Sequence, residues 1–268
     1  MSEWLSIFLL AVIQGLTEFL PISSSGHLAL LPWLTGLQDQ GLSLDVAVHV
    51  GTLIAVVGYF RGEVVLLISH SIKSLFGGPQ TLYSRLAWAI GLATIFVGLA
   101  GMMFDDFIGD VLRNPIPIAV ATIVFGIVLG WADKTGKQMR NIDSIGWSDA
   151  VVIGIAQAIA LIPGTSRSGI TIAAGLAVGL TRDAAARFSF LLSIPVILLA
   201  GAWQGFNWIE TTGHDGINWQ QMLFAIGVSA FFAWVCIHYF LRFIDRVGLM
   251  PFVIYRLVLG VILLIVFV

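Results

Sequence analysis

Charged residues are scarce in this chain of 268 residues, making up only 10% of it. A soluble globule of this size needs more polar groups to cover its surface. The hydrophobic content of 58% and the mean hydropathy of +0.98 agree with that deficit. The formal net charge is -2 and no basic cluster is present, so we expect no nucleic acid partner. The composition predicts an integral membrane protein.

Cysteine is nearly absent as well. The single cysteine, Cys236, lies in an apolar segment and can form no intramolecular disulfide, so the sequence does not indicate a redox compartment. A basic region near Met1 is also lacking, because Glu3 stands there instead. With no small-residue cleavage site before Pro21, we expect no cleavable signal peptide.

Long apolar runs dominate the chain instead. A transmembrane helix takes roughly 17 to 25 residues, and six segments satisfy that length. They lie at about residues 44–60, 86–104, 115–132, 186–204, 219–241 and 251–268. Residues 63–78 carry Glu63, His70 and Lys73 among apolar residues and are expected to lie along the membrane interface.

Two further apolar regions are interrupted by polar residues. Residues 4–36 are interrupted from Pro21 to Gly26, the first break, and residues 147–181 from Pro163 to Gly169, the second break. Irregular backbone at membrane depth is tolerated only where protein or a water-filled cavity covers it. Both regions are therefore predicted to be re-entrant hairpins.

The two breaks align with each other at a constant spacing. Gln157 follows Gln14 by 143 residues, and the same offset relates Ser23, Ser25 and Gly26 to Ser166, Ser168 and Gly169. We predict one all-α polytopic membrane domain, residues 1–268, built as a repeat of about 1–140 and 141–268. Each half would be a re-entrant broken-helix hairpin plus three transmembrane helices. Because three is odd, the second half is inverted, as in transporters whose site lies where the broken helices meet.

The distribution of charge supports this topology, because Lys and Arg in short loops favour the cytoplasm. The basic residues that fall on one predicted side are Arg61, Lys73, Arg85, Lys134, Lys137, Arg140, Arg182, Arg187, Arg242 and Arg246. The opposite side receives Asp105, Asp106, Asp110, Glu210 and Asp215 with Arg113. Both termini are therefore expected outside the cytoplasm.

The first break follows a carboxylate at membrane depth. Gln14 and Glu18 are four residues apart, so on a helix they share a face and can jointly bind a cation or a water. Alternatively, Gln14 packs in a helix interface and Glu18 caps the following turn. A carboxylate at the centre of a spanning helix costs about 2.5 to 3.5 kcal/mol, which favours the functional interpretation.

Three serines and a histidine complete the first motif. Ser23, Ser24 and Ser25 precede Gly26 in the pattern of a helix start, whose N–H groups bind phosphate. His27 lies one turn beyond Ser24, so it can act as base to that hydroxyl or attack phosphorus itself. Taken singly, His27 fits a core histidine equally well. His49, in the first full span, faces either the site or a helix interface, and core packing is the preferred interpretation.

The second break places an arginine among hydroxyls at another helix start. Arg167 is flanked by Ser166 and Ser168 and followed by Thr171. A guanidinium presents a planar fork of donors that matches phosphate oxygens. The alternative is an ion pair between Arg167 and Glu18 that only holds the two hairpins together. Such an ion pair does not explain why hydroxyl groups surround Arg167.

The two motifs together closely resemble the bacterial undecaprenyl-diphosphate phosphatase family, the type associated with bacitracin resistance. They are Gln14-Gly-Leu-Thr-Glu18 running on to His27, and Pro163-Gly-Thr-Ser-Arg-Ser-Gly-Ile-Thr171. The resemblance also covers the length, the duplication and the closing segment Pro251 to Arg256. It implies a multi-pass protein of the bacterial cytoplasmic (inner) membrane.

The resemblance also implies roles for residues. Glu18 would be catalytic and would bind a divalent cation, Mg²⁺ or Ca²⁺, with support from Gln14, which stands where the family accepts Glu or Gln. Ser24 or His27 would attack phosphorus. Arg167 would clamp the diphosphate, with Ser23, Ser25, Ser166, Ser168 and Thr171 as further donors.

We therefore predict hydrolysis of undecaprenyl diphosphate to the monophosphate, which recycles the lipid carrier of cell-wall synthesis. The substrate and membrane lipid are the expected partners, and a homodimer is a further possibility. The alternative function is a polyprenyl-phosphate flippase or transporter, because inverted repeats with broken helices are transporter architecture.

Overall fold

The computed structural model describes residues 3–24, 26–28, 42–110, 114–212 and 218–267. Within these ranges the regular structure is helical, and the one isolated bridge pairs Arg140 with Leu180. The helices are α1 (Glu3–Thr17), α3 (Leu42–Tyr59), α4 (Arg61–Leu75), α5 (Leu82–Asp110), α6 (Pro115–Thr135), α7 (Trp147–Ile159), α8 (Arg167–Ala177), α9 (Arg182–Thr212), α10 (Trp219–Val247) and α11 (Met250–Phe267). A short 3-10 helix, Ile142–Ser144, precedes α7.

Five of the described helices, namely α5, α6, α9, α10 and α11, are long and apolar enough to cross a membrane. A sixth candidate is the pair formed by α3 and α4, which is bent by 83° at Phe60. The chain is thus a polytopic all-helical membrane protein. The predicted span at 44–60 corresponds to α3, and the bend turns α4 away from the direction of α3.

Local sequence explains where several helices begin and end. Pro115 opens α6, where its missing N–H costs nothing because the first N–H groups of a helix have no intrahelical partner. The Asn218 side chain caps α10 by accepting a hydrogen bond from the Gln221 N–H. Gly248 ends α10 with a φ of 70°, a left-handed conformation that glycine adopts without steric cost.

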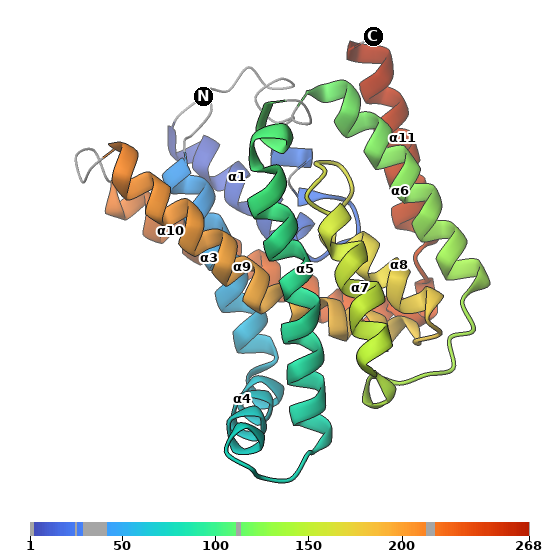
Figure 1. The fold of residues 1–268 in the computed structure, drawn as a ribbon. Helices are drawn as coiled ribbons and strands as arrows, with labels where there is room; N and C mark the ends of the chain where they lie inside the picture. The colour runs from blue at the N-terminus through green and yellow to red at the C-terminus, as the bar shows by residue number, and fades with distance from the viewer. Residues whose placement is uncertain (1–2, 25, 29–41, 111–113, 213–217, 268) are drawn as a thin grey trace.

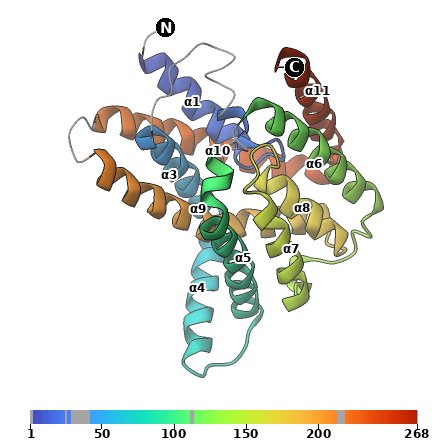
Figure 2. The same cartoon turned by 45° about the horizontal axis from the view of Figure 1, so that its top comes forward.

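The short helices α1 and α7 pack against long helices of the other half of the chain (Figures 1 and 2). Helix α1 lies on α10, and α7 lies on α5. Glycines permit these close approaches: a Cβ on Gly15 would lie 2.7 Å from the Ser229 carbonyl oxygen, and one on Gly154 would lie 2.8 Å from the Ala93 Cα. Both short helices therefore end inside the bundle, where the chain breaks.

The long helices enclose that centre. Helix α6 pairs with α11, and α3 packs against both α9 and α10. The first residues of α1 and the end of α11 lie at one end of the molecule, at the top of Figure 1, whereas α4 lies at the opposite end.

Ion pairs join helix ends to the connecting segments. Arg182 lies 2.6 Å from Asp133, and Arg140 lies 2.6 Å from Asp149. Hydrogen bonding to the Asp149 carboxylate raises the pKa of the Arg140 guanidinium above its ordinary value. The first pair joins the end of α6 to the start of α9, and the second joins the loop between α6 and α7 to the start of α7.

Candidate active site

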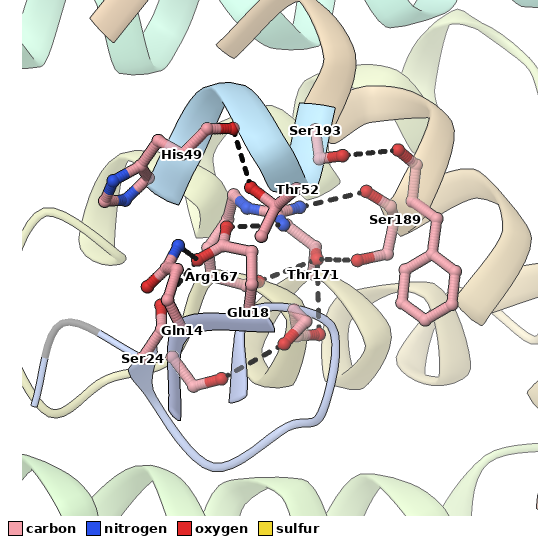
Figure 3. A network of polar contacts seen from close by, with 12 residues as sticks. Gln14, Glu18, Ser24, His49, Thr52, Arg167, Thr171, Ser189 and Ser193 are labelled. Carbon is pink, nitrogen blue, oxygen red and sulfur yellow. Dashed lines mark hydrogen bonds and ion pairs between the residues drawn. The ribbon is translucent and has the colours of Figure 1, made fainter. Parts of the chain in front are cut away.

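The centre of the site is the carboxylate of Glu18, which follows the last turn of α1 and is only 8% exposed. Its Oε2 accepts a hydrogen bond of 2.6 Å from the Ser24 hydroxyl and one of 3.0 Å from the Gln14 amide (Figure 3). The side chains of Gln14 and Ser24 therefore converge on one oxygen of the Glu18 carboxylate inside the bundle.

Arg167, the first residue of α8, reaches the same carboxylate from the second break. Its Nη2 lies 3.2 Å from Glu18 Oε1, and its Nη1 donates to the Ser189 carbonyl at 3.1 Å. Both side chains are largely buried, so the pair is shielded from solvent. The structure thus brings together four predicted site residues from two distant segments of the sequence, namely Gln14, Glu18, Ser24 and Arg167.

The hydroxyls of the second break support this arrangement. Ser168 donates to the Leu20 carbonyl at 2.8 Å, which ties the second break to the first. Thr171 donates to the Arg167 carbonyl at 2.8 Å and lies 2.7 Å from the Ser189 hydroxyl. In this structure these hydroxyls position backbone and neighbouring side chains around the carboxylate.

Both breaks use the same backbone device. Ser23 and Ser166 have φ values of 77° and 70°, in the left-handed region that residues other than glycine seldom adopt. The Ser23 hydroxyl accepts from the Gly26 N–H at 3.2 Å, and the Ser166 hydroxyl accepts from the Gly169 N–H at 3.1 Å. Each serine therefore caps the helical turn that follows its break.

His27 is bound on both sides by partners other than Ser24. Its Nδ1 lies 2.6 Å from the Ser23 carbonyl oxygen and its Nε2 lies 2.6 Å from the Tyr255 hydroxyl. A carbonyl can only accept, so Nδ1 carries the proton and Nε2 accepts from Tyr255. The His27 and Tyr255 rings also stack, with centroids 5.8 Å apart. The geometry pairs Ser24 with Glu18, and His27 with Tyr255.

Several residues around the site were missed or undervalued at the sequence level. His49 of α3 is drawn with Glu18 and Arg167 among the residues of the polar network in Figure 3, although packing was the preferred interpretation for it. Ser189 and Ser193 lie one turn apart on α9; Ser189 bonds to Thr171, and Ser193 donates to the Phe190 carbonyl (Figure 3). Serines spaced four apart on an apolar helix were the available signal for them. Ser25, a predicted donor, lies outside the described residues.

The groups in this site that could bind a divalent cation are oxygen atoms. In the described part of the chain, no three His, Cys, Asp or Glu side chains lie close enough together to hold a metal ion. Gln14 Oε1, however, is buried without a hydrogen-bond partner, next to the Glu18 carboxylate. Mg²⁺ is commonly bound by one or two protein oxygens together with water and substrate phosphates. Gln14 and Glu18 fit a cation of that kind.

The chain is similar to known proteins over nearly its whole length. Residues 7–262 match the model of the family described as bacitracin resistance protein BacA. The chain is 52% identical to the undecaprenyl-diphosphatase of Nitrosococcus oceani, with 97% of this chain and 98% of that protein covered. It is 52% identical to undecaprenyl-diphosphatase 2 of Stutzerimonas stutzeri, covering 99% and 98%, and 53% identical to the undecaprenyl-diphosphatase of Thioalkalivibrio sulfidiphilus, covering 96% and 97%.

Proposed function

The chain belongs to the BacA family of bacitracin resistance proteins, and we infer that it is an undecaprenyl-diphosphatase of a bacterial membrane. It hydrolyses undecaprenyl diphosphate to undecaprenyl phosphate and inorganic phosphate. The relatives at about half identity over nearly the whole chain bear that name and favour the hydrolase over the transporter.

One observation carries the proposed mechanism: the Ser24 hydroxyl donates to Glu18 Oε2 at 2.6 Å. A serine nucleophile needs a base within hydrogen-bond reach, and this carboxylate is the base in contact with it. The Glu18 carboxylate is in turn fixed by Arg167 and Gln14, so the pair is oriented before substrate arrives.

In the first step Ser24 Oγ attacks the terminal phosphorus of the lipid diphosphate while Glu18 takes the hydroxyl proton. The bond from that phosphorus to the bridging oxygen breaks, and undecaprenyl phosphate leaves. In the second step water attacks the phosphoserine, inorganic phosphate departs, and the proton returns to Ser24 Oγ. Arg167 binds the equatorial oxygens and offsets their charge, which is most of what phosphoryl transfer requires of a protein.

In this proposal His27 is a positioning residue and not the nucleophile. With Nδ1–H bound to Ser23 and Nε2 accepting from Tyr255, it holds the turn that presents Ser24. A proton-transfer role would require Tyr255 to release Nε2. Ser23, Ser25, Ser166, Ser168 and Thr171 remain proposed as supports of the phosphate site.

Glu18 and Gln14 would hold a divalent cation, Mg²⁺ or Ca²⁺, which would supply further neutralisation of phosphate charge when bound. Removing divalent cations with a chelator and adding back each metal separately tests this proposal.

The proposed topology is a single domain with an inverted repeat, about 1–140 and 141–268, in the cytoplasmic membrane with both termini outside. The matched φ values of Ser23 and Ser166 support a repeat, as does the packing of α1 on α10 and of α7 on α5. The shared end of α1 and α11 in Figure 1 is consistent with both termini on one side. A homodimer remains a proposal for solution measurement.

The test uses purified protein in detergent, where no transport across a membrane can occur. Wild-type protein should release inorganic phosphate from undecaprenyl diphosphate, and acid quenching during turnover should trap phosphate on the chain. Ser24→Ala should lose both signals. Near-native turnover by Ser24→Ala would exclude the serine mechanism, and a wild-type protein that releases no phosphate would overturn the hydrolase assignment.

A further inference from the structure

Arg256 of α11 is the largest fully buried side chain of the described structure, with 0% of its surface exposed. A guanidinium has five N–H donors, and in this structure each of them reaches a main-chain carbonyl oxygen. The acceptors are Thr122 at 3.1 Å, Pro21 at 3.2 Å, Thr165 at 2.9 Å, Gly164 at 2.8 Å and Ala121 at 3.5 Å.

These acceptors come from three separate segments. Pro21 belongs to the first break, Gly164 and Thr165 belong to the second, and the other two carbonyls lie on α6. The Arg256 side chain therefore bonds directly to the backbone of both breaks. Ser168 bonding to Leu20 is a further polar link between them, apart from the ion pair of the active site itself.

A buried cation with only carbonyl partners requires an explanation. Among the described ion pairs none includes Arg256, so its charge is balanced by dipoles alone. Desolvating a charge is costly unless hydrogen bonds and geometry compensate for it. Its Nη1 also lies 3.0 Å from the position that a Cβ on Gly169 would take, directly beside the first turn of α8. That turn starts at Arg167, the proposed phosphate ligand.

We propose that Arg256 is a positioning residue for the phosphatase reaction, which fixes the two breaks relative to each other through their carbonyls. This proposal rests on the proposed function. By holding Pro21 and Thr165 on one guanidinium, Arg256 sets the separation between the Ser24–Glu18 pair and Arg167. Its buried positive charge also favours the anionic diphosphate at the adjacent helix start.

A positioning role predicts a loss in turnover rather than in substrate binding. Misplacing reacting groups by about 1 Å can cost about 100-fold in rate even when the changed residue is remote from the chemistry. We expect Arg256→Met to lower kcat by about that factor, with KM nearly unchanged. Arg256→Lys keeps the charge with three donors and should retain an intermediate kcat, since it can hold only some of the carbonyls.

The glycines of α6 offer a matched pair that leaves Arg256 in place. A Cβ on Gly126 would lie 3.1 Å from Arg256 Cβ, and a Cβ on Gly130, one turn later, would lie 3.2 Å from Val253 Cγ1. Both Gly126→Ala and Gly130→Ala tighten the contact between α6 and α11 to a similar degree. Only Gly126→Ala presses on the arginine, so it alone should lower kcat, by several-fold.

A second control separates function from stability. Arg182→Met removes a guanidinium that lies 2.6 Å from the buried Asp133 carboxylate, away from the breaks. It should lower the thermal unfolding midpoint while kcat stays at the wild-type value. All variants are assayed for kcat, KM and thermal midpoint as purified full-length protein in detergent.

The possible results decide the proposal in either direction. A kcat series of wild type, Gly126→Ala, Arg256→Lys and Arg256→Met in falling order supports it. A wild-type kcat for Arg256→Lys and Arg256→Met, equal losses for Gly126→Ala and Gly130→Ala, or losses found in KM instead of kcat would overturn it. If Arg256→Met does not fold, Arg256→Lys and the glycine pair decide. Phosphate capture on Ser24 tests the proposed function separately, because it uses no Arg256 variant.

Discussion

The two breaks share a backbone and differ in the residue that this backbone presents. Each has a serine with positive φ whose hydroxyl caps the next helical turn, at Ser23 and at Ser166. The following residue is Ser24 in the first break and Arg167 in the second, and both contact the Glu18 carboxylate. One structural device therefore delivers a hydroxyl from one side and a cation from the other.

The carboxylate itself has no counterpart in the second break. Leu161 stands at the repeat position that corresponds to Glu18, whereas the preceding glutamines, Gln14 and Gln157, are both kept. Each glutamine is fully buried, and the Oε1 of each lacks a hydrogen-bond partner. The chemistry thus depends on the positions where the breaks differ, and the architecture depends on those they share.

The largest expected effect comes from removing the hydroxyl that distinguishes the first break. Ser24→Ala should lower kcat by about 10⁴-fold, because the nucleophile and the proton transfer to Glu18 are lost together. Initial rates of phosphate release measure it. Ser24→Cys replaces the hydroxyl by a thiol, a weak hydrogen-bond donor that would not keep the short contact with Glu18, and should not restore the rate. An Ala variant with more than trace activity would move the attack to water or His27.

Removal of the cation from the second break should have the next largest effect. Arg167→Lys keeps the charge but loses the two-pronged geometry that reaches Glu18 and Ser189, so kcat/KM should fall by about 100-fold. Both KM and kcat should change, since phosphate is contacted in ground and transition states. A purely structural ion pair would instead leave KM unaltered and lower the thermal midpoint.

His27→Gln should be milder than either change, with kcat lowered by about 10-fold, because a glutamine amide reaches the place of Nε2 and can still bond to Tyr255, while only the bond from Nδ1 to the Ser23 carbonyl is lost. Tyr255→Phe removes the hydroxyl bound to Nε2 and should lower kcat by a smaller factor. The pH–rate profiles of these two variants test whether His27 is the attacking group. An attacking histidine would be inactive as glutamine and would become more reactive without Tyr255.

Gln14→Glu would add a second carboxylate within about hydrogen-bond distance of Glu18, where the amide now donates at 3.0 Å. Like charges at that distance repel unless a cation lies between them. We expect activity to change by about threefold or less at saturating Mg²⁺ but to depend more steeply on its concentration. Titration of Mg²⁺ against rate would show a curve superimposable on wild type if no cation binds here.

The smallest effects are expected at the shared serines. Ser23→Gly and Ser166→Gly each relieve a left-handed φ, which gains about 1 kcal/mol. The lost cap costs a few tenths of a kcal/mol and the added freedom of the unfolded chain costs about 0.4 to 1 kcal/mol, so the contributions should nearly cancel in the free energy of unfolding. Thermal midpoints in detergent measure the result. The comparison of the breaks predicts similar small shifts for both, and a large difference between them would show that the breaks are held differently.

Much of the site could be predicted because it lies in contiguous motifs. Gln14 to His27 and Pro163 to Thr171 each combine a helix-start pattern with residues that are costly in a membrane, so Glu18, Ser24 and Arg167 stood out. The pairing of Ser24 with Glu18 instead of His27 could not be read, because it depends on how the turn after α1 is folded. The family resemblance, confirmed by the comparisons, supplied the substrate.

The residues that escaped prediction are those whose function is set by tertiary contact. Tyr255 and Arg256 lie in the closing segment that shares the family resemblance, but neither was assigned a role in the site, because only packing brings them to His27 and to the breaks. Among the spans, the bend of 83° after α3 was not predicted as such, although Gly58 and Gly62 flank Phe60 and residues 63–78 were expected to leave the direction of the span. The repeat and its orientation remain predictions.

The environment of Cys236 has a practical consequence. The thiol is 7% exposed and donates to the Leu16 carbonyl, so a membrane-impermeant maleimide added to intact cells has little access to it. Because it is the single cysteine in the chain, the unmodified protein already serves as a nearly silent background for labelling. A cysteine introduced beside Trp219 or beside Lys73 would then report which face of the membrane each loop occupies.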